Sequence, residues 1–236
     1  MGGNGFDLAQ PCGGTASRAS CSRIGAGLVW IARACLSGRW LLSIDHPGVI
    51  DELNTLPKSP IPGPGIATFI FPALPILHDA VGHVYKLAMS LPEAPLLRFR
   101  AKTTGLPQTT EAERLVVQRI GQDVFRDALM DYWGGRCPLT GITEPALLRA
   151  SHIVPWAECD DAHRLDVHNG LLLSALWDAA FDKGLVSFAD DGTVLASSQL
   201  SDNARKTLGI GGVPPLRGLR PAHCKNLSVH RTRYGL

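Results

Sequence analysis

Two carboxylates four residues apart are the clearest candidates for chemistry in this sequence. Asp178 and Asp182 lie in a segment whose start at Ser174 and stop at Gly184 predict a short helix. Residues at this spacing share one helix face, so the carboxylates would repel each other unless a cation lay between them. Oxygen ligands favour a hard divalent ion, which predicts Mg²⁺ or Mn²⁺ before Zn²⁺ or Ni²⁺. The competing interpretation is that Asp182 faces solvent and that Asp178 pairs with a nearby Lys or Arg.

A histidine and an asparagine precede this pair. His152 lies in a segment, 147–156, that is predicted to be extended, and Asn169 stands before Gly170 in a predicted turn. A histidine can take a proton from water near neutral pH, as a general base must. Each residue also has an ordinary structural interpretation, because a histidine in an apolar strand is often a hydrogen-bonded core residue.

The order of three motifs is more specific than any one residue. The chain contains, in sequence, R-A-S-H-I-V-P-W, R-L-D-V-H-N-G-L-L-L and L-W-D-A-A-F-D-K-G. Together they resemble the HNH endonucleases, in particular a bacterial branch with S-H-I-x-P-W and F-D-x-G motifs, over roughly residues 77–234. The resemblance implies a ββα-metal (His-Me finger) core that cuts DNA. His152 would be the general base, Asn169 would hold its loop, and Asp178 and Asp182 would bind the metal.

The chain departs from the HNH pattern at two positions. Asp178 stands where the final histidine is usual, so the sequence is an H-N-D variant, and Ser151 stands where many members have a metal ligand. We favour an active enzyme, because the two aspartates keep ligand spacing. The alternatives are a catalytically degenerate nucleic-acid-binding module that retains the ββα fold, and a structural or protein-interaction domain.

Charge and composition limit the partners. The net charge is only +2, so phosphate binding requires locally gathered basic side chains. Arg149, Arg164 and Lys183 are close to the motifs in sequence and are candidates for contacts with flanking phosphates. The sequence is compatible with a homo-oligomer, and it identifies no protein partner.

The cysteines and the hydrophobic runs indicate the cellular compartment in which the protein is expected. The six cysteines form no C-x-x-C pair, which argues against a structural zinc site, and the N-terminus lacks a cationic signal start. No apolar run is long and uncharged enough to cross a bilayer. We therefore expect a cytoplasmic protein without a membrane segment.

The elements that would position these residues predict an α+β fold: a ββα-metal core with additional helices and an α+β N-terminal region. We expect a disordered segment at 1–24, an N-terminal α+β region of unknown role at 25–104, and the HNH nuclease domain at 105–236. Thr110 and Glu113 form a capping box at the start of a long helix. Elsewhere, strands are predicted at 40–44 and 67–71, helices at 77–89 and 201–208, and a hairpin around 190–192. The apolar stripe predicted for the long helix comprises Leu115, Val116, Ile120, Val124, Leu129 and Tyr132.

Overall fold

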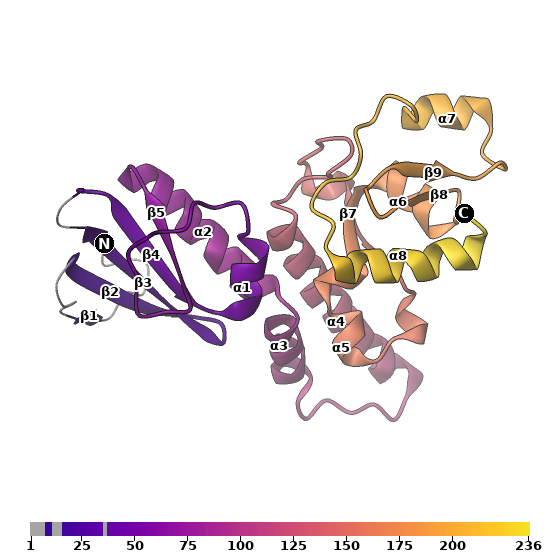
Figure 1. The fold of residues 1–236 in the computed structure, drawn as a ribbon. Helices are drawn as coiled ribbons and strands as arrows, with labels where there is room; N and C mark the ends of the chain where they lie inside the picture. Colours follow the sequence, from indigo (N-terminus) through magenta and orange to yellow (C-terminus); the bar gives the residue numbers. More distant parts are fainter. Residues whose placement is uncertain (1–7, 11–15, 35–36) are drawn as a thin grey trace. The chain divides into compact units, whose positions relative to one another are not determined.

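The computed structural model describes residues 8–10, 16–34 and 37–236, which divide into two compact units, Met1–Ala94 and Pro95–Leu236 (Figure 1). The boundary lies before the expected one at residue 104. Pro95 lies in the first turn of helix α3 (Glu93–Thr103), where the missing amide hydrogen is not needed, so the helix runs across the boundary. Phe99 of α3 is buried in the core of the second unit, so the helix belongs largely to that unit.

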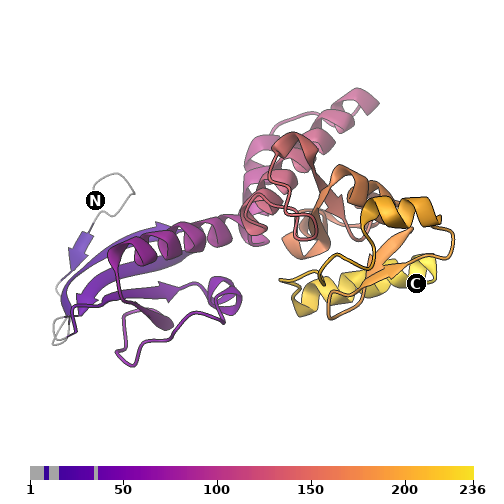
Figure 2. The same cartoon turned by 90° about the horizontal axis from the view of Figure 1, so that it is seen from above.

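The first unit is an antiparallel sheet with strand order β1-β2-β3-β4-β5. Helix α2 (Leu74–Ser90) lies along one face of this sheet (Figure 2). The strands predicted at 40–44 and 67–71 and the helix predicted at 77–89 are present, the helix with a longer span. The remaining bounds are β1 (Leu8–Gln10), β2 (Ala16–Ile24), β3 (Gly27–Ala34), β4 (Trp40–Asp45), α1 (Pro47–Glu52) and β5 (Ala67–Phe71).

Part of the segment expected to be disordered is a strand. Residues 16–24 form β2 and pair with β3, with Ser22 opposite Val29 and Ile24 opposite Gly27. The pairing comes from the apolar β3 strand, which local composition around residues 16–24 does not reveal. Residues 1–7 and 11–15 of the predicted segment lie outside the described residues.

The second unit begins with its longest helix, α4 (Glu111–Tyr132). The predicted capping box is present: Thr110 Oγ1 accepts from Glu113 N, and the Glu113 carboxylate accepts from Thr110 N. The predicted apolar stripe is wrong at its start, because Leu115 and Val116 are 50% and 52% exposed. The helix extends beyond its packing partners there. Its buried face consists of Gly121, Val124, Phe125, Ala128 and Leu129.

The β-β-α order predicted for the chemical segment is present. Strands β6 (Leu148–His152) and β7 (Gly170–Ser174) pair in antiparallel register with His152 opposite Gly170, and α6 (Ala175–Asp182) follows. Ser174 occupies the N-cap position of α6, but its side chain makes no capping hydrogen bond. Three short helical turns lie in the connections, η1 (Pro145–Leu147), η2 (Trp156–Glu158) and η3 (Val167–Asn169), together with α5 (Asp161–Arg164).

Gly170 is required for packing between β7 and α4. Its backbone is extended, with φ −147°, so it does not serve a left-handed turn. A Cβ atom at this position would lie 2.5 Å from Phe125 Cζ and 2.8 Å from Leu129 Cδ1. The glycine therefore lets α4 approach the strand opposite His152.

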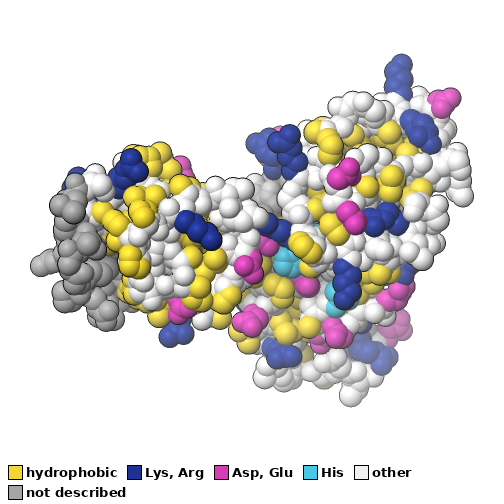
Figure 3. All heavy atoms as spheres, in the orientation of Figure 1, with side chains coloured by type: hydrophobic (Ala, Val, Ile, Leu, Met, Phe, Trp, Pro, Cys, Tyr) yellow, Lys and Arg dark blue, Asp and Glu magenta, His cyan; other side chains and the backbone are white. Residues whose placement is uncertain are grey.

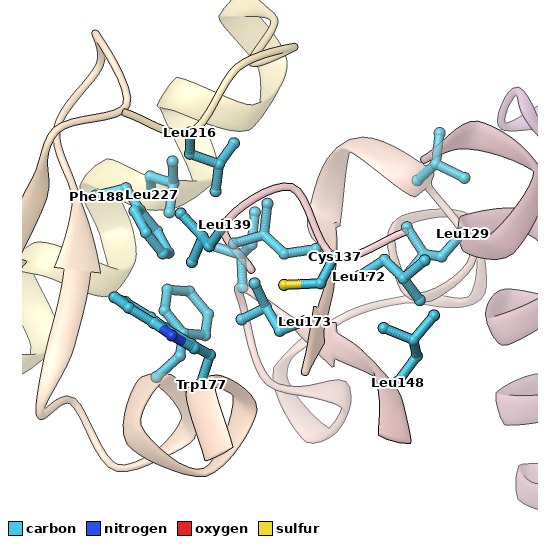
Figure 4. Packing of buried hydrophobic residues seen from close by; sticks show 14 of the residues in the cluster. Leu129, Cys137, Leu139, Leu148, Leu172, Leu173, Trp177, Phe188, Leu216 and Leu227 are labelled. Atoms are coloured by element: carbon cyan, nitrogen blue, oxygen red, sulfur yellow. The ribbon is translucent and has the colours of Figure 1, made fainter. Parts of the chain in front are cut away.

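The remainder of the unit closes the core. Strands β8 (Val186–Phe188) and β9 (Val194–Ala196) form the predicted hairpin, and α7 (Asp202–Leu208) has Ser201 as its N-cap and Gly209 as its left-handed C-cap. Helix α8 (Pro221–Tyr234) then packs beside β8 and η3. Figure 4 shows the buried side chains between α4 and α8, including Leu129, Leu172, Trp177 and Leu227. Among the described residues, no helix has the length and apolar character needed to cross a membrane.

Candidate active site

His152 is held between two aromatic side chains. Its ring stacks on Phe125 of α4, with centroids 3.9 Å apart and planes 19° apart, and meets the Trp156 ring edge-on at 5.5 Å. On the loop side, His152 Nε2 lies 2.9 Å from the carbonyl oxygen of Arg164. The ring is therefore fixed by stacking and by one hydrogen bond.

The hydrogen bond to Arg164 determines where the imidazole carries its proton. A carbonyl oxygen only accepts, so Nε2 must donate, and in the neutral ring Nδ1 keeps a lone pair. Burial lowers the pKa of His152 below its ordinary value, against the opposing effect of the Arg164 carbonyl. At neutral pH His152 is thus an uncharged base with Nδ1 as the accepting atom.

Asn169 is fully buried and ties together the loop that follows His152. Its Oδ1 accepts from Val154 N at 2.8 Å, and its Nδ2 donates to Val154 O at 3.2 Å and to His163 O at 3.3 Å. Nδ2 also lies 3.5 Å from Cys159 Sγ. The asparagine thus bonds both the beginning of the loop, at Val154, and its end, at His163. His163 directly precedes Arg164, whose carbonyl accepts from His152.

Asp178 lies against β6. The Ser151 hydroxyl donates to its carboxylate, and Arg149 lies close enough to favour its charged form. Burial and the nearby Asp182 act in the opposite direction and raise the pKa of Asp178 above its ordinary value. The residue that replaces a usual metal ligand, Ser151, is therefore in direct contact with an aspartate on the neighbouring helix.

Asp182 is exposed at the end of α6 and is paired with Lys183, whose Nζ lies 2.8 Å from Asp182 Oδ2. Two hydrogen bonds from α8 hold the backbone at this helix end. Tyr234 Oη donates to Asp182 O at 2.9 Å, and His230 Nε2 donates to Phe181 O at 3.1 Å. The side chain of Asp182 faces solvent while its backbone is anchored.

The donor set fits a hard divalent cation. A carboxylate whose pKa is raised by burial and by a second carboxylate gains stability when a cation neutralises both charges. The described residues contain no group of three or more His, Cys, Asp or Glu side chains placed to hold a metal.

Part of the second unit matches a known protein family. Residues 137–189, under a quarter of the chain, match the HNH endonuclease family. This segment belongs to the HNH endonuclease family. Among curated proteins, no match to the chain was found. The α+β fold of the second unit agrees with the family, and the resemblance recognised from the three motifs is confirmed. HNH endonucleases act on nucleic acid and generally use a divalent metal, and the match suggests nuclease activity for this segment at that general level.

The three basic candidates, Arg149, Arg164 and Lys183, lie within the HNH segment and differ in how many hydrogen bonds and ion pairs they make. Arg164 Nε donates to Trp156 O at 2.8 Å, its Nη1 pairs with Asp161, and its guanidinium lies 5.2 Å from the Trp156 ring centroid. Lys183 pairs with Asp182. Arg149 donates from Nη1 to two backbone carbonyls, Ala146 O and Leu148 O. On the face shown in Figure 3, Lys and Arg side chains alternate with Asp and Glu over the second unit and form no continuous basic patch.

Sequence reasoning missed most of the residues that support the HNH site. Phe125 lies within the predicted long helix but outside its predicted apolar stripe, yet it stacks on His152. His163 and Asn226 carried no motif signal, because their contact joins positions far apart in the chain. Trp156 was part of the S-H-I-x-P-W motif, which could have pointed to it as a neighbour of His152.

Proposed function

We propose that the HNH domain is a metal-dependent endonuclease that hydrolyses phosphodiester bonds in DNA. The observation that carries the proposal is His152: it is neutral at physiological pH, and its Nε2 is committed to the Arg164 carbonyl, so Nδ1 is left to accept a proton. The match of residues 137–189 to a nuclease family supports the same conclusion.

In the proposed mechanism, His152 takes a proton at Nδ1 from the water that attacks phosphorus, and the bond between phosphorus and the leaving 3′ oxygen breaks. Asn169 keeps the loop, and with it the Arg164 carbonyl, in place as the ring becomes positively charged. The positive ring then donates a stronger, charge-assisted hydrogen bond to that carbonyl, which favours the protonated state in the transition state.

Asp178 and Asp182 would hold the divalent metal, with Ser151 orienting Asp178 through its hydroxyl. When bound, the cation supplies Lewis-acid stabilisation of the charge that develops on the phosphate oxygens. Mg²⁺ or Mn²⁺ suits two carboxylates better than Zn²⁺ or Ni²⁺, because no histidine or cysteine belongs to the pair.

Arg149 is the best placed of the three basic candidates to contact a flanking phosphate. It lies beside Asp178, and its remaining N–H groups can donate to phosphate oxygens. Arg164 is engaged by Trp156 and Asp161, so its contribution to binding would come second. Lys183 would have to leave Asp182, and metal binding at Asp182 would promote that release.

The test is cleavage of supercoiled plasmid DNA and of a matched RNA, with Mg²⁺, Mn²⁺, Ni²⁺ and Zn²⁺ in parallel. We expect nicking that requires Mg²⁺ or Mn²⁺ and is abolished by His152→Ala. His78→Ala is the matched control, since that histidine is 74% exposed on α2. Cleavage by His152→Ala at the wild-type rate would refute the assignment of the base. DNA binding that weakens steeply with salt but never leads to cleavage would instead identify a degenerate binding module.

A further inference from the structure

Asn226 of α8 is a buried amide that uses both ends of its side chain on the loop around the site. It is 8% exposed. Its Oδ1 accepts from His163 Nε2 at 3.1 Å, and its Nδ2 donates to His168 O at 2.9 Å. Both partners lie more than fifty residues earlier in the chain. A side chain that satisfies both its donor and its acceptor on one loop restricts the position of that loop.

The two contacts of Asn226 flank the atoms that hold His152. The carbonyl oxygen of His163, the first partner, also accepts from Asn169 Nδ2, and the next carbonyl along the chain, that of Arg164, accepts from His152 Nε2. His168, the second partner, directly precedes Asn169 in the chain. Asn226 therefore bonds the segment 163–168 at both ends.

We propose that Asn226 is a positioning residue for His152, acting through His163 and the Arg164 carbonyl. The proposal rests on the proposed role of His152 as the base. Asn226 lies outside the matched segment 137–189, so it assigns part of α8 to the site. Its loss would loosen the segment 163–168 and with it the acceptor that selects the tautomer of His152.

Helix α8 has other anchors, which makes a variant at Asn226 interpretable. Leu227 is fully buried in the core, and His230 stacks on Phe181 with centroids 4.0 Å apart. Arg231 Nη1 also donates to Phe188 O at 2.7 Å. With these contacts intact, removing the Asn226 amide loosens the loop and leaves the helix in place.

The experiment compares Asn226→Ala with wild type in the full chain, at a temperature at which both proteins are fully folded. We expect kcat for plasmid nicking to fall by about 10- to 100-fold, the scale of a small displacement of a catalytic group. KM should change by less than about 2-fold, because substrate binding is not removed. His163→Ala should have a similar effect, and the double variant should be no worse than either single variant, since both changes break one chain of contacts.

Two further variants separate the contacts and control for the helix. Asn226→Asp keeps an acceptor for His163 but cannot donate to His168 O, so its kcat should lie between those of wild type and Asn226→Ala. Cys224→Ala removes a contact on the same helix, from Sγ to Asp190 O, that does not involve the loop. It should leave kcat unchanged.

A second measurement does not depend on activity. The ring of His152 lies over Phe125, so its NMR resonance, assigned by comparison with His152→Ala, reports the position of the ring. We expect this resonance to shift in Asn226→Ala and to stay in place in Cys224→Ala. An unchanged resonance, or an unchanged kcat in a folded Asn226→Ala variant, would overturn the proposal. If wild type cuts no nucleic acid, the proposed function fails, and the resonance alone decides whether Asn226 positions His152.

Discussion

Replacing Asn169 with alanine tests the account of the site most directly. The change removes the acceptor for Val154 N and the donor to the carbonyl oxygens of Val154 and His163, in a position with no solvent access. A buried polar group left without a partner costs about 1–3 kcal/mol. Because the two carbonyls can relax more easily than the amide, we expect a loss of about 2–4 kcal/mol in the free energy of unfolding.

Urea unfolding gives the stability change, and plasmid nicking gives the effect on catalysis. Since the chain contains two compact units, the loss should appear in only one transition, that of the unit containing Asn169. At temperatures where the variant is folded, kcat should fall by about 100-fold, because the Arg164 carbonyl is no longer held.

The control for Asn169→Ala is Asn203→Ala on the exposed side of α7, which should change stability by less than about 0.5 kcal/mol. A stability loss below about 1 kcal/mol for Asn169→Ala would contradict the hydrogen-bond network, since one orphaned amide alone exceeds that value. A large stability loss with an unchanged kcat would refute the link between the loop and the base.

Three further predictions concern pH, metal and backbone. The base must be neutral to accept a proton, and burial lowers the pKa of His152 below 6.5. We therefore expect kcat to rise with pH up to an inflection below 6.5 and to stay flat above it. An inflection above 6.5 in the initial rates would contradict the assignment of His152 as the base. Asp178→Asn should raise the Mg²⁺ concentration for half-maximal rate by at least about 10-fold, and chelation should abolish wild-type cleavage until Mg²⁺ or Mn²⁺ is restored; an unaltered titration would exclude Asp178 as a ligand. Gly184→Ala should cost at least about 1 kcal/mol more in urea unfolding than Gly134→Ala, because both glycines have φ +64° but only the first would place a Cβ atom 2.1 Å from the Tyr234 ring. Equal losses for the two glycine variants would show that the ring moves aside freely.

The sequence predicts local features of this fold well, because they depend on neighbouring residues. The capping box at Thr110 and the hairpin before Thr193 each need only a few adjacent positions, and each is present. The long helix is correct in existence, but its buried face is not. Burial of Leu115 depends on what packs against it, and nothing within the helix reveals that α4 extends beyond its neighbours.

In the candidate site too, some residues could be predicted from local motifs and others could not. The motifs identify His152, Asn169 and Asp178. The register of β6 and β7 places His152 opposite Gly170, the residue that follows Asn169. The contacts that orient them come from elsewhere: Phe125 from α4, and Asn226 and His230 from α8. Such contacts join positions tens of residues apart, and pattern or spacing in one sequence carries no trace of them.

The position of α8 in the chain has a consequence for synthesis. Its residues Asn226, His230 and Tyr234 follow every other group of the site, so they leave the ribosome after the histidine and both carboxylates. Until then, the segment 163–168 lacks its bonds to Asn226, and the end of α6 lacks its bonds to His230 and Tyr234. The order of the sequence is therefore also an order of assembly, in which the contacts around the segment 163–168 and the end of α6 form after the groups that they position have been synthesised.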